Sequence, residues 1–221
     1  MAWRSGGIRR AFDPKVRRRR CGTGGCRPAA PFCCAAWLCH CARRALRQSA
    51  AMSNLIIRQA ASAADMAAIR DLCRDYRQVL VDRLPDRPEI LANYYAEADY
   101  EALLHALPEK HARPDGAIFV AELDGHVVGC GMTHRVGPET CEIKRVFTAE
   151  AARGHGAARQ IFAAAMAQAK ADGYRVMVLD TLVRLVEAIA LYEKLGFTDW
   201  EPFYDLPEGF GDLVRFYGKE L

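Results

Sequence analysis

The feature that most constrains this chain is a strand-like run followed closely by a glycine-bearing turn and a helix. Glu142–Thr148 reads as a β-strand, and Arg153–Ala158 reads as a turn with two glycines that opens a helix. The first amides of a helix have no partners inside it and lie at the positive end of its dipole. Glycines let the backbone approach a ligand closely, and Arg153 adds a positive charge. The junction therefore predicts a phosphate-binding site, and a pyrophosphate is the ligand that it suits best.

Read alone, the same residues also fit a glycine-rich surface turn, and they match neither of two common nucleotide-binding motifs. A Walker-type loop ends in Gly-Lys-Ser/Thr, which is missing here. A Rossmann fingerprint needs Gly or Ala where this chain has Arg159. Asp180 ends a later strand, as an acid does in that fold, but only about 40 residues follow it. That length is too short for the remaining units of a doubly wound sheet.

Residues 1–51 differ in composition from the rest of the chain. They hold twelve of the 31 Lys and Arg residues, a single acid, Asp13, and six of the nine cysteines. The segment is a poor match to a secretory signal, a transit peptide or a zinc site. The basic run Arg17–Arg20 leaves phosphate or nucleic-acid binding open. Because Met52 is followed by a clean strand pattern, we expect residues 1–51 to be a disordered or non-native extension with the true start at Met52.

The composition of residues 52–221 indicates one mildly acidic domain. This part carries 19 basic and 26 acidic residues, and its three cysteines lie in apolar segments without regular spacing. Such usage argues against a secreted disulfide scaffold. No run approaches the roughly 18 apolar residues that a membrane helix needs. We therefore expect a cytoplasmic protein without a membrane segment, and no cluster of residues at metal-ligand spacing.

Periodicity in this domain alternates between helical and strand-like spacing. The expected strands cover residues 55–59, 117–123, 126–134, 140–148, 174–180, 197–200 and 213–217. The expected helices cover residues 62–83, 89–107 and 182–195, with a further helix between the glycine turn and Gly173. Gly129 and Gly131 mark a bulge or a bend inside their strand. The order predicts an α/β fold with a central, mixed, twisted sheet of about seven strands and about four flanking helices.

Two motifs in this domain carry a family resemblance. Arg153, Gly156 and Ala158 match the Arg/Gln-x-x-Gly-x-Gly/Ala signature of the GNAT superfamily of acyl-CoA N-acetyltransferases. The segment Ala188–Phe197 is similar to that family's typical C-terminal segment, and one helix and one strand separate the two motifs, as the fold requires. The resemblance follows most of 52–221 in element order and is concentrated in 141–197. It implies a single GNAT-like domain whose splayed strands form the acyl-CoA cleft.

The resemblance also implies how the donor, acetyl-CoA, is held as a co-substrate. Strand 141–148 would splay from strand 174–180, with acetyl-CoA in the V between them. The pantetheine arm would lie along the backbone of Val146, Phe147 and Thr148, with the Val146 amide near the thioester carbonyl. The pyrophosphate would be held by the amides of Arg153, Gly154, His155, Gly156, Ala157 and Ala158.

Two catalytic roles follow from the same resemblance. Tyr192 would be the general acid for the leaving thiolate, because a tyrosine pKa of about 10 suits a thiolate of similar basicity. Glu142 would be the general base, and alternation would put it on the strand face of Val146 and Thr148. The residues alone leave alternatives open: Glu142 could pair with a basic neighbour, and Tyr192 could pack in the core. Leu185 departs from the family, since many members carry there an asparagine that touches CoA.

The acceptor side is less defined. The resemblance points to the first two helices and to the loop before the last strand, with the candidates Tyr94, Tyr95, Tyr100, Phe203, Tyr204 and Asp205, whose alternative role is ordinary packing. An aromatic and acidic surround suits a small primary amine. We therefore expect direct acetyl transfer from acetyl-CoA to such an amine in a ternary complex. The alternative is a non-catalytic acyl-CoA-binding or sensing module. The partners expected are acetyl-CoA and the amine rather than nucleic acid, and a homodimer is left open.

Overall fold

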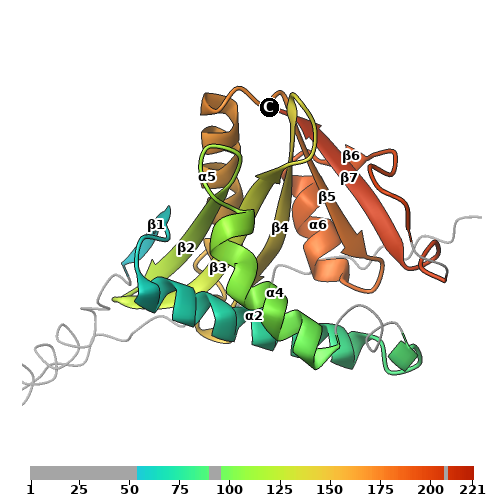
Figure 1. The fold of residues 1–221 in the computed structure, drawn as a ribbon, viewed down its shortest axis with the longest axis horizontal. Helices are drawn as coiled ribbons and strands as arrows, with labels where there is room; N and C mark the ends of the chain where they lie inside the picture. The colour runs from blue at the N-terminus through green and yellow to red at the C-terminus, as the bar shows by residue number, and fades with distance from the viewer. Residues whose placement is uncertain (1–53, 90–95, 207–208) are drawn as a thin grey trace, which may run out of the picture. The chain divides into compact units, whose positions relative to one another are not determined.

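A seven-stranded sheet organises the residues that the computed structural model describes, which are 54–89, 96–206 and 209–221 (Figure 1). The strands lie in the order β1-β2-β3-β4-β5-β7-β6. Their bounds are Leu55–Gln59 for β1, Ala117–Leu123 for β2, His126–Arg135 for β3, Thr140–Thr148 for β4, Val176–Leu182 for β5, Thr198–Asp199 for β6 and Val214–Glu220 for β7. All neighbours pair antiparallel except β4 and β5, which are parallel. The predicted mixed sheet is confirmed.

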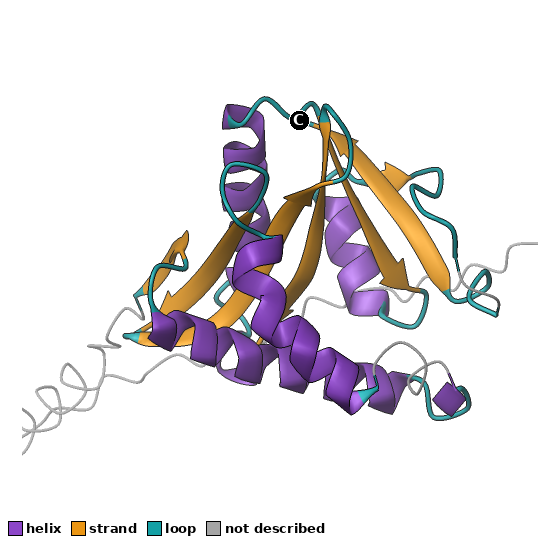
Figure 2. Cartoon of the chain, viewed as in Figure 1, coloured by secondary structure: helices purple, strands orange, loops and turns teal. Residues whose placement is uncertain are grey.

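Four α-helices cover the two faces of this sheet within the described residues. They are α2 (Ala63–Arg83), α4 (Glu97–Lys110), α5 (Ala157–Ala171) and α6 (Val186–Lys194), and the short 3-10 turn η1 (Glu150–Ala152) precedes α5. Helices α2 and α4 lie in front of the sheet in Figure 1, whereas α5 and α6 lie behind it. Figure 2 shows the same layers by colour, with purple helices on both sides of the orange strands. The α/β layout is therefore also confirmed. None of these helices combines the length and apolar composition needed to cross a membrane.

The apolar residues of each strand are divided between these two layers. Behind the sheet, Phe119 and Ile143 pack with residues of α5 such as Phe162. In front of it, Val120 and Met132 pack in a second cluster that α2 and α4 complete. Alternation along β2 thus sends neighbouring residues to opposite cores, which fixes the register of the sheet.

The start of α2 is fixed by a capping box. The Asp65 amide donates to Ser62 Oγ at 3.0 Å, and the Asp65 carboxylate accepts from the Ser62 amide at 3.1 Å. Arg58 on β1 also bonds this carboxylate, at 2.7 and 2.9 Å, and together these contacts lower the pKa of Asp65. The charged pair ties the first strand to the first helix. Because Asp65 is buried, losing one partner would cost more than an exposed pair contributes.

Strand β4 contains a bulge that shapes the site. Its partner β3 pairs Met132 with Lys144 but Cys130 with Phe147, so two β4 residues oppose Gly131. Arg145, the first of the two, has a φ of 52°. A Cβ on Gly131 would lie 2.6 Å from the Ile161 side chain, so only glycine fits opposite the bulge without a shift. A separate irregularity lies on β3 itself, where Val128 is the extra residue between the pairs Glu122–Val127 and Ala121–Gly129, so the bulge predicted inside this strand is confirmed near Gly129.

Some element bounds differ from those predicted. Strand β5 continues to Leu182, which pairs with Val214 on β7, so α6 begins at Val186 instead of residue 182. Tyr174 belongs to the cap of α5 and not to a strand, because its amide donates to Ala169 O at 3.0 Å. Residues 90–95 of the second expected helix lie outside the described residues.

Helix α4 also continues beyond Pro108, where a loop was expected. Proline has no amide hydrogen, so the carbonyl of Leu104 loses its usual helical partner. Arg70 on α2 donates to that carbonyl instead, with Nε 3.4 Å from the oxygen. The tertiary contact makes the proline tolerable in the last helical turn.

Candidate active site

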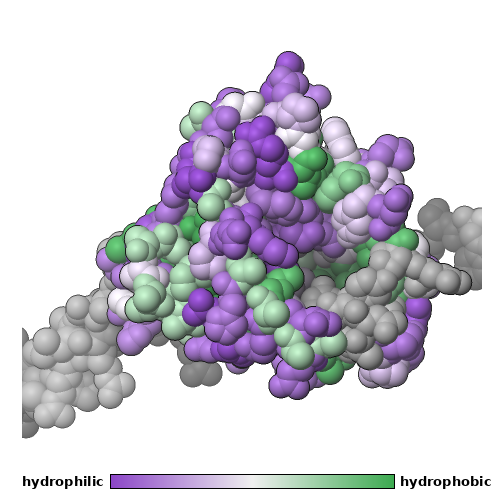
Figure 3. Space-filling view, in the orientation of Figure 1, coloured by the Kyte–Doolittle hydropathy of each residue, from purple (hydrophilic) through white to green (hydrophobic). Residues whose placement is uncertain are grey.

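The parallel strands β4 and β5 separate and leave a cleft. They pair only from Thr140–Glu142 to Val176–Val178, although both strands continue beyond these residues. The cleft holds about 560 Å³. Of the residues predicted to bind the donor or act in catalysis, it is lined by Val146, Phe147, Thr148, Arg153, Ala158 and Tyr192. The face that carries α2 and α4 is mainly hydrophilic, with smaller hydrophobic patches (Figure 3).

The glycine turn has the geometry of a helix N-terminus that is open to a ligand. Gly154 and Gly156 have φ values of 79° and 70°, which disfavour other residues, and Gly156 is the N-cap of α5 without a side-chain cap. Two of the six amides predicted to hold pyrophosphate already have partners. The Arg153 amide donates to Glu150 O at 3.0 Å, and the His155 amide donates to Ala152 O at 3.3 Å.

The remaining turn residues differ in whether they line the cleft. Ala158, in the first turn of α5, lines the cleft, while Ala157 is buried in the core behind the sheet. Gly154, His155 and Gly156 are exposed and lie outside the residues that line the cleft. Helix-start amides, rather than those of Arg153 and His155, are therefore the available donors on this side.

Tyr192 reaches the cleft from α6. Its ring packs against Phe162, Phe197 and Tyr217, with centroid distances of 5.5, 6.4 and 6.0 Å. Burial raises the pKa of Tyr192 to about 12, although a hydrogen bond with Thr181 acts in the opposite direction. Both sequence interpretations thus describe part of its surroundings: the ring is packed in aromatic surroundings, and the residue also faces the cleft. At neutral pH the hydroxyl keeps its proton and can donate it.

Glu142 lies on a different face of β4 from the one predicted. Val146 packs against the core behind the sheet, whereas Phe147 packs against the core in front of it. Ile143 belongs to the rear core, so the preceding Glu142 side chain is on the front side. The prediction that Glu142 shares a face with Val146 and Thr148 is wrong, because the bulge at Arg145 breaks the alternation.

The Glu142 carboxylate is buried, with 3% of its side chain exposed, and it does not line the cleft. One oxygen accepts a hydrogen bond from Lys144 Nζ, and the other lies 3.2 Å from His134 Nε2. Burial raises the pKa of Glu142 to about 7, against the effect of the Lys144 ammonium. The structure thus contains the pairing with a basic neighbour that the sequence left open, and the base role stays a prediction.

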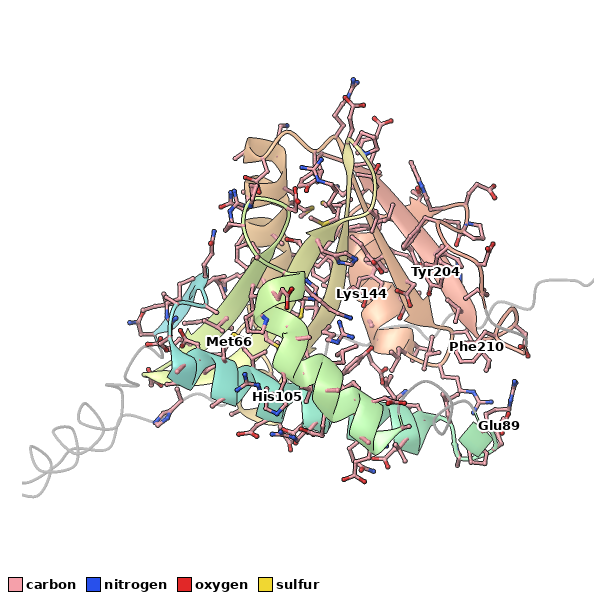
Figure 4. All side chains as sticks on the ribbon, in the orientation of Figure 1. Met66, Glu89, His105, Lys144, Tyr204 and Phe210 are labelled. Carbon is pink, nitrogen blue, oxygen red and sulfur yellow. The ribbon has the colours of Figure 1, made fainter. Side chains whose placement is uncertain are left out.

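Lys144 joins Glu142 to a second carboxylate. Its Nζ lies 3.2 Å from Oδ1 of Asp180, and both Lys144 and Asp180 line the cleft. Burial opposes the charge of Lys144, but Asp180 and Glu142 outweigh it and raise the lysine pKa. The ammonium also lies 5.7 Å from the centre of the Tyr204 ring, which belongs to the loop after β6, and both side chains are labelled in Figure 4. A bridged pair of carboxylates therefore borders the cleft.

Two histidines extend this network toward α4. The His111 and His134 rings meet edge to face with centroids 5.3 Å apart, and His111 Nδ1 donates to Thr133 O at 2.9 Å. Burial and nearby positive charges lower the pKa of both histidines to about 4. Both rings are therefore neutral at pH 7. His134 then contacts Glu142 through a neutral N–H and not through an ion pair.

The predicted acceptor residues do not all meet at the cleft. Tyr94 and Tyr95 lie outside the described residues. Tyr100 is buried between α4 and α2, and its hydroxyl donates to Cys73 O at 2.8 Å, so packing accounts for it. Phe203 and Tyr204 form an aromatic group with Phe216, with centroid distances of 5.1–5.3 Å. Asp205 is exposed and does not line the cleft.

Leu185 supplies apolar surface where many family members have an asparagine. It is the N-cap of α6 without a side-chain cap hydrogen bond, and it lines the cleft. Its side chain packs with Leu80, Leu84 and Phe210 in a third apolar cluster. The position therefore offers packing in place of an amide contact to the donor.

Sequence reasoning did not identify several residues of the cleft, notably Lys144, Arg145, Asp180 and Tyr76. The spacing of Glu142 and Lys144, two apart on one strand, is a signal that could have found the lysine. Asp180 was considered only as an acid of a different fold. Across the described residues, no group of three or more His, Cys, Asp or Glu side chains is arranged to hold a metal ion.

Comparison with known proteins agrees with this geometry. The profile of the acetyltransferase (GNAT) family matches residues 75–197, more than half of the chain. The chain belongs to this family.

Individual relatives vary in how much of their length is matched. YjgM of Escherichia coli strain K12, an uncharacterized N-acetyltransferase, is 39% identical over 97 residues, which are 42% of this chain and 58% of that protein. The chain thus spans less than two thirds of that relative. An IAA acetyltransferase of Azospirillum brasilense is 36% identical over 132 residues, 58% of this chain and 80% of the relative. The solved structure of yncA from Salmonella typhimurium with its cofactor acetyl-CoA has a TM-score of 0.53 at 22% identity, covering 76% of this chain and 94% of that one.

Proposed function

We propose that this protein transfers the acetyl group of acetyl-CoA to the primary amine of a small molecule, directly, within a ternary complex. The observation that carries the proposal is the cleft between the separated ends of β4 and β5. The edge of one strand, the first turn of α5 and a tyrosine that holds a proton all border the same space. Family membership and the acetyl-CoA bound to yncA support the choice of donor.

On the donor side, the proposal uses mainly backbone groups. Beyond Glu142 the edge of β4 has no register partner on β5, so it can accept an extended pantetheine arm as a further strand would bind. Val146 also lacks a register partner on β3, which supports a role for its amide at the thioester carbonyl. The open first turn of α5 would face the pyrophosphate, with Ala158 nearest the cleft.

In the chemical step, the amine nitrogen attacks the thioester carbonyl carbon, and the carbon–sulfur bond breaks. The leaving thiolate takes a proton from Tyr192, which is protonated at neutral pH. Because burial makes Tyr192 a weaker acid than usual, its hydrogen bond would stabilise the thiolate before the proton moves. The amine loses its own proton to a carboxylate of the cleft.

Two carboxylates compete for that last role. Glu142 is the base that the sequence predicts, and a pKa of about 7 suits a general base. Asp180, however, lines the cleft, whereas Glu142 lies behind Lys144 and His134. We therefore assign the contact with the amine to Asp180, and we assign to Glu142 the positioning of Lys144 beside it.

The experiment is an amine panel assayed with acetyl-CoA, in which mass spectrometry identifies any acetylated product. The full chain should acetylate at least one small primary amine. Tyr192→Phe should lower kcat about 100-fold without changing the affinity for acetyl-CoA, because it removes only the proton donor.

A matched control is Tyr217→Phe, since the Tyr217 ring packs against Tyr192 and its buried hydroxyl has no hydrogen-bond partner among the described residues. This variant should keep full activity. If acetyl-CoA binds while no amine in the panel is acetylated, the catalytic proposal fails in favour of a non-catalytic acyl-CoA-binding module.

A further inference from the structure

Arg145 stands out among the charged residues of the cleft. The β4 bulge gives it a φ of 52°, and it lines the cleft beside Lys144. Its charge helps to lower the pKa of His111 and His134, whose rings meet beside β3 on the side of α4. The bulge thus breaks the regular alternation that would send the consecutive cations Lys144 and Arg145 to opposite faces.

The partners of these cations differ. Arg83 and Arg153 also line the cleft, and each has a carboxylate, Glu187 at 2.9 Å and Glu150 at 3.1 Å. Lys144 is held between Glu142 and Asp180. For the half-buried Arg145, by contrast, no carboxylate of residues 54–89, 96–206 or 209–221 lies within ion-pair distance. Its charge acts on His111 and His134, which are both neutral at pH 7.

A half-buried arginine without a counter-ion is suited to an anionic ligand. Desolvation weakens the competition from water, and the guanidinium can bind a carboxylate through two parallel hydrogen bonds. The donor's phosphates are expected at the start of α5, which packs behind the sheet, whereas Arg145 acts in front of it. The free positive charge is therefore on the acceptor side.

We propose that the acceptor is an α-amino acid or a close analogue, and that Arg145 binds its carboxylate while its amine lies near Asp180. This inference rests on the proposed acetyl transfer and names its substrate class. The acid Asp180 and the unpaired cation Arg145 line one cleft, so together they complement the two charges of a zwitterion. Tyr76 of α2 also lines the cleft, with its ring centroid 5.9 Å from that of Phe147, and adds apolar surface for the amino acid side chain. We expect amino acids with apolar side chains, such as methionine and phenylalanine.

The test compares each amino acid with its amide, which keeps the amine and the side chain but has no carboxylate charge. The native full-length chain should have a kcat/KM for L-methionine and L-phenylalanine at least about tenfold above that for their amides. Arg145→Asn should reduce this preference to near one, because asparagine tolerates a positive φ but carries no charge. Arg145→Lys should keep most of the preference. Acetyl-CoA binding by all three proteins verifies that the variants are folded.

Two results would overturn the inference while leaving acetyl transfer intact. One is acetylation of the amides as efficiently as the acids by the native chain. The other is an unchanged preference in Arg145→Asn. If the native chain acetylates no amine, the proposed function fails, and the carboxylate subsite is then tested by calorimetry with N-acetyl-L-methionine and its amide. Binding of the acid alone, lost in Arg145→Asn, would support the subsite, and equal binding of both compounds would refute it.

Discussion

The two sides of the cleft differ in the chemical groups they offer, which are backbone groups on one side and side chains on the other. On the proposed donor side, the edge of β4 and the first turn of α5 offer backbone groups. On the proposed acceptor side, Lys144, Arg145 and Asp180 offer charged side chains that come from two strands, and α2 and the loop after β6 add aromatic rings. A site formed by backbone groups depends on the conformation of a local turn. A site formed by side chains depends on which residues the fold brings next to one another.

This difference predicts that changes on each side affect different kinetic constants. Backbone amides bind the common part of an acyl-CoA donor and leave little room for variation. Side chains around the amine can change without disturbing the turn, so acceptor choice is free to vary on a constant donor site. The predictions below use this separation, beginning with the largest expected effect.

The largest effect is expected at the carboxylates bridged by Lys144. Asp180→Asn should lower kcat about 100-fold, because it removes the group that receives the amine proton. Glu142→Gln should lower kcat less, about tenfold, since Glu142 acts through Lys144. Activity of the native chain should rise as pH increases through about 7, where Glu142 ionises, and Glu142→Gln should remove that step. The reverse order of the two kcat losses would return the base role to Glu142.

On the donor side, Ala158→Glu should raise the KM for acetyl-CoA about 30-fold. The added carboxylate would lie at the helix start beside the proposed pyrophosphate, where repulsion of about 2 kcal/mol is expected. Steady-state kinetics with varied acetyl-CoA measures this. The matched control is Ala163→Glu, an exposed position on the same helix, which should leave the KM unchanged. Equal effects of the two substitutions would argue against a pyrophosphate at this helix terminus.

A smaller effect, on the free energy of unfolding, is expected at His134, whose ring contacts Glu142. The folded pKa of His134 is about 4, below the usual 6.5, so the unfolded chain binds more protons between these values. The stability that His134 contributes is complete above pH 6.5 and is lost as pH falls toward 4. Urea unfolding at pH 7 and pH 5 should differ by about 1–2 kcal/mol from this residue. His134→Gln should remove this contribution and leave the similar one from His111, whose pKa is also about 4, and substitution of the exposed His105 should remove neither.

The strand, the turn and the helix of the proposed donor side could be predicted because local patterns encode them, whereas donor binding by these residues stays a prediction. A strand, a glycine pair with positive φ and a helix start are contiguous in the chain, and the turn chemistry of Gly154 and Gly156 determines their geometry. The mixed sheet and the bulge near Gly129 were predictable for the same reason, but the bulge at Arg145 was not. Errors arose where tertiary contacts decide, as with Pro108, whose missing helical bond is replaced by a contact from Arg70.

The acceptor side could not be predicted in the same way. Strict alternation placed Glu142 with Val146, and the inserted Arg145 reversed that relation, which only the register with β3 reveals. Lys144 becomes important through Asp180, 36 residues later in the chain, because their strands are adjacent. Side-chain groups assembled from distant segments leave no local motif.

The separation of donor and acceptor sides is tested most directly by two-substrate kinetics on Ala158→Glu and Arg145→Asn, with acetyl-CoA and L-methionine both varied. We predict that Ala158→Glu raises the KM for acetyl-CoA and leaves that for methionine unchanged, while Arg145→Asn does the opposite. If each substitution raised both constants equally, the cleft would not be divided between a backbone-built donor site and a side-chain-built acceptor site.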